Sequence, residues 1–347
     1  MDTRTTLFPL PLFAALAIHA QSLVSTEPMP RTALLEEFTA AGCGNCPAAH
    51  VVANDLATVH GDDLMIIGIH GGGLAAPQAG QPDFRTPDGT ALWSAFAVPF
   101  QPIGMVNRQG LQQASGWMAA VSTVLSEISP VNIGVASSFD AGTQTLTVDV
   151  ELYYTGEGPV GDDAIHVALT QDGIVARQQD YQNGVQQNYM HRHVLRDLLT
   201  PVQGDPVSTT AIGSFVQRTY SLPVPSGWTL ADLDVVAFVS EGAAGVVHQA
   251  RQVDADGGIT TTVDGTAGAL GLGNVYPMPA HDLVTFTFTD EAAGRVLILR
   301  DGLGRIVMQE QVNAYGANVV ISVGGLAAGL YHAGLDGGRT KKVLVSH

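Results

Sequence analysis

The chain has 347 residues, of which 46% are apolar and 14% are charged, and its formal net charge at pH 7 is −17. A chain of this length is expected to form two or three domains, and its apolar content excludes a largely disordered protein. Only 15 lysines and arginines stand against 32 acidic residues, which excludes nucleic acid as a partner because phosphate recognition needs clustered cations.

The first 20 residues have the pattern of a secretory signal peptide. Arg4 precedes an apolar run at 7–18, and Ala20 is a small residue at a suitable cleavage point. The run is too short to cross a bilayer as a helix, which needs about 20 residues, and no later segment is long or apolar enough. We therefore predict a signal peptide over residues 1–20 and no transmembrane span, the alternative being an uncleaved anchor.

Residues 30–128 alternate strand-like and helix-like patterns. A strand at 32–38 precedes an amphipathic helix at 46–60, whose Val52, Leu56 and Val59 share one face. The continuous apolar run at 64–69 is typical of a strand covered on both faces. This alternation predicts an α/β domain. It continues with a short helix at 92–96, a strand at 103–107 and a helix capped by Ser115, with Trp117, Val121, Val124, Leu125 and Ile128 on one stripe.

The rest of the chain is rich in strands. Residues 131–252 contain apolar alternating runs separated by turn-rich connections, which predicts a β-sandwich, with a polar insert at 178–200 that we expect to be helical. Residues 253–273 are mostly small and predict a linker. Residues 274–347 predict a small β-sandwich, in which Asp301-Gly302 lies between two apolar runs as the turn of a hairpin.

The chain contains two cysteines, Cys43 and Cys46, with two residues between them. They lie between the predicted strand at 32–38 and the predicted helix at 46–60. Cys43 is therefore expected near a helix N-terminus, where the partial positive charge favours a thiolate. The pattern predicts Cys43 as a nucleophile and Cys46, one helical turn on, as the resolving thiol.

Two further residues complete a thioredoxin-type site. Glu37 lies six residues before Cys43 on the incoming strand and is the candidate proton acceptor. Pro102 opens the strand at 103–107 and is the candidate for the proline, often preceded by a cis peptide bond, that faces the cysteines; Pro99 is the alternative. The predicted catalytic residues are therefore Cys43, Cys46, Glu37 and Pro102.

Two resemblances fit these motifs. The segments LLEEFTAAGCGNCP and PIGMVNR, with YMHRHVLRDLL downstream, resemble the 28-kDa outer-membrane-protein family. This resemblance implies a thioredoxin-like domain at 30–128 followed by the β-sandwich domain at 131–252. The segments NVYPMPAHDLVTFTF, GLYHAGL and KKVLVSH resemble the type A C-terminal sorting domain of the type IX secretion system, although Met278 replaces the asparagine of its usual Tyr-Pro-Asn-Pro-Ala opening.

The resemblances imply a multidomain protein that is secreted or held at the cell surface in association with the outer membrane, with the type IX secretion machinery as a partner. Two functions remain open. One is thiol–disulfide exchange on extracytoplasmic proteins, with protein thiols as substrates. The other is a non-enzymatic surface binding or structural protein in which the cysteine pair is a structural disulfide. Ala41-Gly42 stands where thioredoxins place an aromatic residue, which alters the substrate-facing surface.

Two other motifs do not predict a site. The run at 70–73, His-Gly-Gly-Gly, can build an esterase oxyanion hole, but the sequence lacks the accompanying Gly-x-Ser-x-Gly elbow. His191 and His193 would share one face of a strand, yet no third metal ligand is evident and Arg192 and Arg196 disfavour a cation. We therefore predict neither a metal nor a cofactor.

Overall fold

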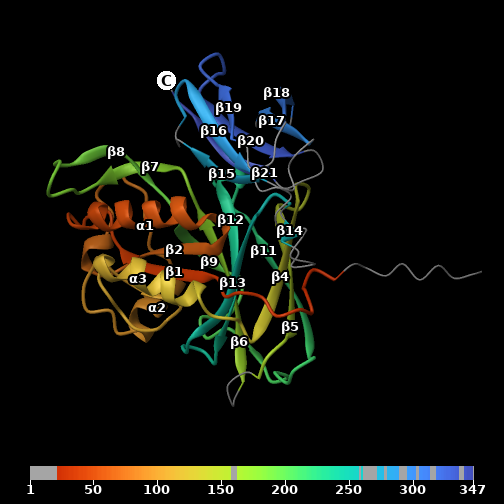
Figure 1. Ribbon diagram of the computed structural model, residues 1–347. Coiled ribbons are helices and arrows are strands. Elements are labelled where there is room, and N and C mark those ends of the chain that lie inside the picture. Colours follow the sequence, from red (N-terminus) through yellow and green to blue (C-terminus); the bar gives the residue numbers. More distant parts are fainter. Residues whose placement is uncertain are drawn as a thin grey trace, which may run out of the picture.

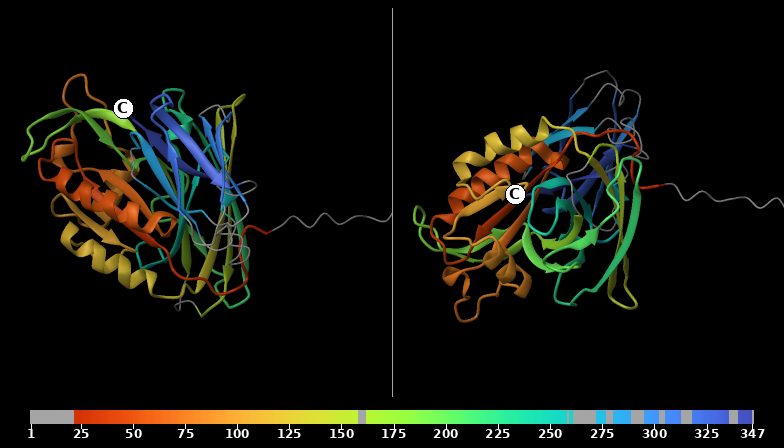
Figure 2. Two further views of the ribbon diagram at one scale, coloured as in Figure 1. Left: turned by 45° about the horizontal axis from the view of Figure 1, so that its top comes forward. Right: turned by 90° about the horizontal axis from the view of Figure 1, so that it is seen from below.

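The computed structural model (Figure 1) describes residues 22–157, 162–257, 259–260, 272–276, 280–288, 295–301, 305–312, 318–335 and 340–346. The signal peptide predicted at 1–20 lies outside the described residues. The expected fold class is confirmed, because an α/β part with parallel strands is followed by further β-sheets and a small C-terminal β-module. Figures 1 and 2 show α1, α2 and α3 gathered at one end of a long sheet, with a second sheet at the opposite end.

Strand β1 (Ala33–Thr39) is the centre of the α/β part. It pairs in parallel with β2 (Leu64–His70) and antiparallel with β3 (Ile103–Val106), and all three strands are buried. Because side chains alternate along a strand, Leu35 packs with residues of α1 and α3, whereas Leu34 packs with Leu92 of α2 on the other face. The helices are α1 (Cys46–His60), α2 (Pro87–Ala95) and α3 (Ala114–Leu125), with 3₁₀ turns η1 (Gly61–Asp63), η2 (Gly73–Ala75) and η3 (Leu230–Asp232).

The buried face of α1 differs from the predicted one. The helix buries Ala49, Ala53 and Leu56, whereas Val59 is 65% exposed and Val52 is half-buried. Alanines let the helix axis lie close to the sheet, so the small residues, and not the larger valines, face the core. In the same way α3 begins after Gln113, so Ser115 lies inside its first turn and does not cap it.

The α/β part and the β-sandwich share one sheet. Its strand order is β13-β12-β6-β9-β2-β1-β3, with β10 paired to β6. Strand β9 is the connection, since it pairs with β2 at Val194 and with β6 on its other side. Gly68 of β2 permits this approach, because a Cβ there would lie 3.2 Å from the His193 carbonyl oxygen. The sandwich strands of this sheet are β6 (Asp163–Gln171), β9 (Val194–Leu198), β10 (Asp205–Val207), β12 (Leu233–Glu241) and β13 (Val247–Asp254).

A second sheet closes the sandwich. It contains β11 (Phe215–Pro223), β5 (Thr145–Tyr154), β4 (Val131–Asp140) and the short β14 (Ile259–Thr260). Alternating residues such as Val148, Val150 and Leu152 of β5 point into a core that the two sheets share. Strand β14 falls within the predicted linker at 253–273, of which residues 258 and 261–271 lie outside the described residues.

The polar insert expected to be helical at 178–200 is instead made of strands. β7 (Ile174–Gln178) and β8 (Gln186–His191) form a two-stranded hairpin, and β9 follows at once. The prediction was wrong because the polar side chains of this segment are not on a solvated helix face. Gln178 and His191 are buried and contact other parts of the chain, as described below.

The C-terminal module packs two small sheets around its own apolar core. Strands β17 and β18 form the hairpin predicted at Asp301-Gly302, although residues 302–304 lie outside the described residues. One sheet contains β15 (Leu272–Tyr276), β16 (Leu283–Phe288) and β19 (Val319–Ser322), and the other contains β17 (Val296–Asp301), β18 (Ile306–Gln311), β20 (Gly329–Leu335) and β21 (Thr340–Val345).

Candidate functional site

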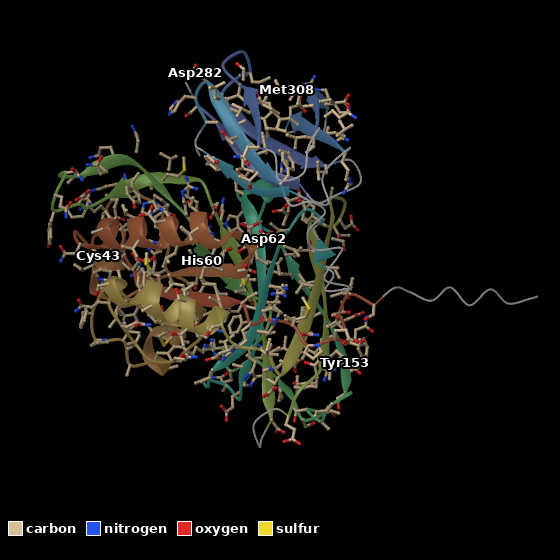
Figure 3. The ribbon with its side chains drawn as sticks, in the orientation of Figure 1. Cys43, His60, Asp62, Tyr153, Asp282 and Met308 are labelled. Carbon is tan, nitrogen blue, oxygen red and sulfur yellow. A yellow bond between two sulfur atoms is a disulfide. The ribbon has the colours of Figure 1, made fainter. Side chains whose placement is uncertain are left out.

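Cys43 and Cys46 form a disulfide at the start of α1, with their Cα atoms 5.4 Å apart. Cys46 is the first residue of the helix, and its N–H donates to the Cys43 carbonyl over 3.3 Å. Figure 3 places Cys43 at the end of the α/β part that lies far from the second sheet of the sandwich. Because a helix N-terminus favours negative charge, this position stabilises a thiolate once the disulfide opens.

The disulfide is covered by the chain itself. Cys43 is 2% exposed and Cys46 is fully buried. The side-chain amide of Gln178, at the end of β7, donates to the carbonyl oxygens of Cys43 (2.9 Å) and Ala40 (3.2 Å). We call residues 178–181 the cap segment. Its contacts with the loop at 40–44 span more than a hundred residues of sequence, which is why the sequence did not predict them.

Backbone pairing continues along the cap segment. Gln179 N–H donates to the Ala41 carbonyl (2.8 Å), and Tyr181 N–H donates to the Gly44 carbonyl (2.9 Å). The Tyr181 ring lies against Gly44, because a Cβ there would be 2.3 Å from the ring, yet Tyr181 is 71% exposed. An exposed aromatic residue therefore does lie beside the cysteines, but it comes from the β7–β8 hairpin and not from the residue before Cys43.

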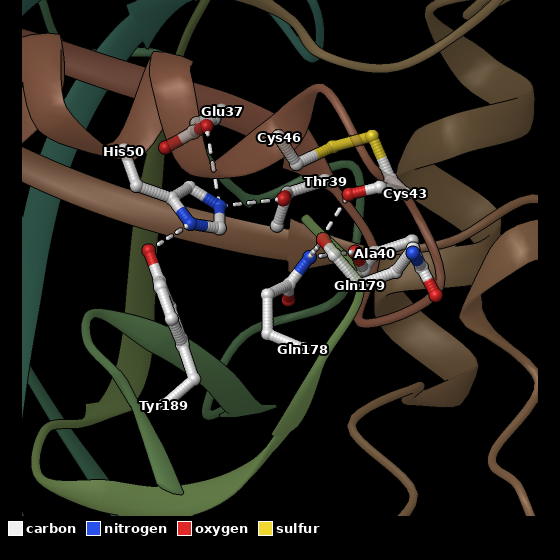
Figure 4. Close-up of a disulfide and its surroundings, with 9 residues drawn as sticks. All are labelled: Glu37, Thr39, Ala40, Cys43, Cys46, His50, Gln178, Gln179 and Tyr189. Atoms are coloured by element: carbon white, nitrogen blue, oxygen red, sulfur yellow. Dashed lines mark hydrogen bonds and ion pairs between the residues drawn. A yellow bond between two sulfur atoms is a disulfide. The ribbon is translucent and has the colours of Figure 1, made fainter. Parts of the chain in front are cut away.

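Glu37 lies on β1 beneath α1, and its carboxyl group is isolated. The residue is 4% exposed, and its Oε1 atom has no hydrogen-bond partner. Burial raises the pKa of the Glu37 carboxyl to about 8, because a carboxylate is poorly solvated there. At neutral pH this group is therefore largely protonated. Figure 4 shows Glu37 in the same close-up as the disulfide.

His50, which was not predicted as a site residue, lies beside Glu37 Oε1. His50 is on α1, and its Nε2 lies 3.6 Å from Glu37 Oε1 and 2.7 Å from the hydroxyl of Thr39. Its Nδ1 lies 2.7 Å from the hydroxyl of Tyr189 on β8 (Figure 4). Burial, with the neighbouring imidazoles of His191 and His193, lowers the pKa of His50 to about 3, so its ring is neutral at ordinary pH.

These residues line a pocket between α1 and the β7–β8 hairpin. The pocket encloses about 380 Å³, part of it open to solvent. Three buried polar atoms among its lining residues have no hydrogen-bond partner: Glu37 Oε1, His70 Nδ1 and His191 Nε2. We call it the histidine pocket. It is lined by Glu37, Thr39, His50, Ala53, Asn54, Ile66, Gly68, His70, Tyr189, Met190, His191, Arg192 and His193.

The histidines expected to share a strand face are separated by a backbone turn. His191 ends β8 and packs its ring against Phe84 (4.6 Å between centroids) and His70 (5.7 Å). His193 follows with a positive φ of 53°, and its Nδ1 lies 3.4 Å from Asp172 Oδ1. Within the described part of the chain, no group of three or more His, Cys, Asp and Glu side chains is arranged to hold a metal ion.

Pro102 is preceded by a cis peptide bond, Gln101–Pro102. It lies directly before β3, which pairs with β1 so that Gly104 is opposite Glu37. Pro102 therefore directly precedes the strand that pairs with the one holding Glu37, and its role in facing the cysteines stays a prediction.

A second buried glutamate lies next to Glu37 but on the other face of β1. Glu36 is 1% exposed and makes a two-point ion pair with Arg108, with N–O distances of 2.9 Å for both contacts. The guanidinium group of Arg108 is held between the rings of Phe96 and Phe238, 5.0 and 4.9 Å from their centroids. Such a fully paired charge is a structural element.

Two segments of the chain match known families. Residues 90–256 match the family described as outer membrane protein Omp28, and residues 274–346 match the secretion system C-terminal sorting domain. Among solved structures, HBP35 of Porphyromonas gingivalis is 17% identical with a TM-score of 0.52, over 91% of this chain and 99% of that chain. A domain of the outer membrane lipoprotein Omp28 from the same organism is 19% identical with a TM-score of 0.26, over 37% of this chain and 89% of that chain. No curated protein matches the sequence.

Proposed function

We propose that this chain, which carries an Omp28 outer-membrane-protein domain followed by a type IX secretion sorting domain, performs thiol–disulfide exchange on extracytoplasmic proteins. The sorting domain makes the chain cargo of the secretion machinery, and the two domains together locate it at the outer-membrane surface or outside the cell. Across the described residues, no helix has the length and apolarity needed to span a membrane. The proposed catalytic residues are Cys43, Cys46, Glu37 and Pro102.

The isolated carboxyl of Glu37 carries this proposal. Burying a carboxyl group without partners costs stability, and a purely structural position would be filled better by an apolar residue. Glu37 is buried with an unpartnered oxygen and a pKa of about 8, close to that of a cysteine thiol. A group with these properties can exchange a proton with a thiol at neutral pH.

The reaction follows from these positions. A substrate thiolate attacks Cys43 Sγ, forming a mixed disulfide and breaking the Cys43–Cys46 bond. The electron pair of the broken bond stays on Cys46 Sγ, which takes the proton of the Glu37 carboxyl. A second substrate thiolate then attacks the substrate sulfur of the mixed disulfide, and Cys43 leaves as a thiolate that the start of α1 stabilises. The substrate dithiol is oxidised and the cysteine pair is reduced.

Attack on Cys43 requires the loop around it to open, because Cys43 is 2% exposed, packs with Ala40 and Ala75, and is tied through its carbonyl to Gln178 of the cap segment. The surface around it suits an unfolded chain as the substrate. Leu74, whose carbonyl accepts from Gly42 N–H, is 50% exposed, and Tyr181 on the other side of the loop is 71% exposed. These two side chains offer apolar contact on either side of the cysteines once the cap segment lifts.

The burial of both cysteines favours a second candidate function. A disulfide whose cysteines are 2% and 0% exposed, in a loop that Gln178 and Tyr181 of the cap segment bond at the carbonyls of Cys43 and Gly44, also fits a structural staple in a surface binding protein. In that case the cap segment stays in place, the disulfide is never opened, and Glu37 exchanges no proton with a cysteine.

Exchange with an unfolded protein separates the two candidates. We would mix the oxidised mature chain with reduced, unfolded ribonuclease and follow disulfide formation in the ribonuclease within a single turnover, beside the Cys43→Ser variant. Thiol–disulfide exchange predicts disulfides formed in amounts equal to the Cys43–Cys46 bonds consumed. Formation no faster than with C43S would establish the staple. After mild reduction, fast iodoacetamide labelling of Cys43 at about pH 6 would independently indicate a reactive thiolate at the start of α1.

Delivery by the sorting domain has its own test. Removing residues 274–347 from the exported chain is expected to leave the protein in the periplasm, because the sorting domain that the secretion machinery recognises is lost. Fractionation of cells that express the full and shortened chains measures this, with a periplasmic marker as control. Unchanged surface delivery of the shortened chain would show that another segment is recognised.

A further inference from the structure

We propose that His50 relays protons between the buried Glu37 carboxyl and the solvent of the histidine pocket. This inference rests on the proposed thiol–disulfide exchange, in which Glu37 must give a proton to Cys46 and regain one. His50 does not contact the sulfur atoms in this role; it acts through Glu37 and is a positioning residue.

Glu37 is almost closed off from solvent, and it meets the histidine pocket beside His50. The residue is 4% exposed on the sheet face covered by α1, and its Oε1 has no hydrogen bond. His50 Nε2 is 3.6 Å away, slightly beyond hydrogen-bond length, so a movement of about 0.5 Å completes the contact.

Both nitrogens of His50 are engaged, which is the arrangement a relay requires. Nε2 lies 2.7 Å from the Thr39 hydroxyl on the Glu37 side, and Nδ1 lies 2.7 Å from the Tyr189 hydroxyl on the pocket side. A neutral imidazole has one N–H and one bare nitrogen, and it can exchange them. The ring can therefore give a proton at one nitrogen while taking one at the other, without ever becoming a cation.

The histidine pocket supplies the outer end of the route. It holds two more orphaned buried atoms, His70 Nδ1 and His191 Nε2, in a polar space large enough for water. Part of the pocket is open to solvent. The titratable and charged groups that face His50 there are Glu37 from β1, His70 from β2, Tyr189 and His191 from β8, and Arg192 and His193 from the segment after β8.

The transfer balances as follows. When the Cys43–Cys46 bond breaks, the Cys46 thiolate takes the Glu37 proton and Glu37 is left as a carboxylate. His50 Nε2–H then donates its proton to Glu37, while Nδ1 accepts the Tyr189 hydroxyl proton, which pocket water replaces. The net result is one proton moved from water to Cys46. Tyr189 keeps its proton before and after, since burial raises its pKa to about 12.

The opposite view is that His50 is a structural residue that ties α1 to β8. Under that view its removal weakens folding and changes the position of the redox equilibrium, but proton transfer is unaffected. The two views differ in the rate of exchange and in its sensitivity to deuterium, so those are the quantities to measure.

The test uses the oxidised mature chain, its His50→Gln and Tyr189→Phe variants, and His60→Gln as the matched control. His60 lies at the far end of α1 and does not line the pocket. Rates of disulfide reduction by dithiothreitol would be recorded between about pH 5 and pH 9, in water and in deuterium oxide. The melting temperature and the equilibrium constant with dithiothreitol would be recorded for each variant.

We expect H50Q to reduce about 100-fold more slowly at neutral pH, the lower end of what positioned proton transfer contributes. We also expect it to lose the deuterium effect of the wild-type chain, while its equilibrium constant and melting temperature match those of H60Q. Y189F should show the same changes to a smaller degree, and it decides the question if H50Q folds poorly. Rates and deuterium effects of H50Q and Y189F equal to those of H60Q would overturn the relay alone. A wild-type chain that dithiothreitol does not reduce would overturn the proposed function together with the relay.

Discussion

Glu36 and Glu37 are neighbours on β1, and both are buried, yet they lie in opposite environments. The Glu36 carboxylate is bound at two points by Arg108, whose guanidinium group is in turn held between two aromatic rings. The Glu37 carboxyl has an unpartnered oxygen and faces a neutral histidine 3.6 Å away. Two consecutive residues therefore differ in pairing. The Glu36 carboxylate is paired with Arg108, whereas one oxygen of the Glu37 carboxyl has no hydrogen-bond partner.

This difference shows how to distinguish a structural charge from a functional one in a buried strand. A buried charge whose hydrogen-bonding atoms all have partners needs no function beyond the structure to explain it. A buried acid without partners reduces stability and has a perturbed pKa, which is the signature of groups that exchange protons. The disulfide, His50 and the histidine pocket all lie on the Glu37 side of β1.

The largest expected effect comes from breaking the paired side. Arg108→Met leaves the Glu36 carboxylate buried and uncompensated, which is expected to cost about 3–5 kcal/mol of unfolding free energy. Urea denaturation measures this. The double variant Glu36→Gln with Arg108→Met should regain most of the loss, since no charge is then left unpaired. A loss under about 1 kcal/mol for R108M alone would show that Glu36 finds solvent and that the two faces are less different than described.

Glu37→Gln should act in the opposite direction. The folded pKa of Glu37 is raised from 4.5 to about 8, so between these values the folded chain binds a proton that the unfolded chain has released. The contribution of Glu37 is therefore present below about pH 4.5 and is lost as pH rises towards about 8, a change of at most roughly 5 kcal/mol. The unfolding free energies of wild type and E37Q should diverge over this window in favour of E37Q. If the unfolding free energies of wild type and E37Q changed in parallel with pH, the pKa of Glu37 would not be raised, and Glu37 would resemble the paired Glu36.

The histidine pocket predicts a smaller effect on the acid side. Burial lowers the pKa of His191 to about 4, while the unfolded imidazole titrates near 6.5, so the unfolded chain takes up a proton that the folded chain cannot. Stability is therefore expected to fall as pH drops below about 6.5. His191→Gln should reduce the slope by about one proton, or ~1.4 kcal/mol per pH unit. Denaturation between about pH 6.5 and pH 5 measures the slope, and an unchanged slope would mean that His191 is already solvated.

The smallest expected effect concerns the access of a reductant to the Cys43–Cys46 disulfide, which lies on the Glu37 side of β1. In Gly44→Ala the new methyl group would lie 2.3 Å from the Tyr181 ring, so the ring must move and the cap segment is held less firmly. We expect a cost under about 1 kcal/mol and reduction by dithiothreitol that is a few-fold faster. Tyr181→Ala serves as a second route to the same state. Equal reduction rates in G44A, Y181A and wild type would show that the cap segment does not limit access.

The sequence allowed the local parts of the site to be predicted, because these depend on neighbouring residues. The strand before Cys43, the helix from Cys46 and the proline before β3 each have a short-range pattern. Two adjacent glutamates on a strand also had to point to opposite faces. Which of the two would find Arg108, 72 residues away, has no local signature.

The parts that were missed all depend on contacts between distant residues. His50 and Tyr189 are 139 positions apart, and Gln178 and Cys43 are 135 apart. The segment that supplies Tyr189 and Gln178 was expected to be helical because it is polar. Gln178 of this segment instead bonds the loop around the cysteines, Tyr189 bonds His50, and Gly68 lets β9 lie close beside β2.

The ionisation of Glu37 is the quantity on which the account depends most directly. Carbon-13 NMR of the oxidised mature chain, labelled at the glutamate carboxyl carbons, measures it across the pH range, with E37Q to assign the signal. The account predicts one carboxyl carbon that titrates near pH 8 and that is missing from the E37Q spectrum. A titration in which no glutamate carboxyl remains protonated above about pH 6 would contradict it.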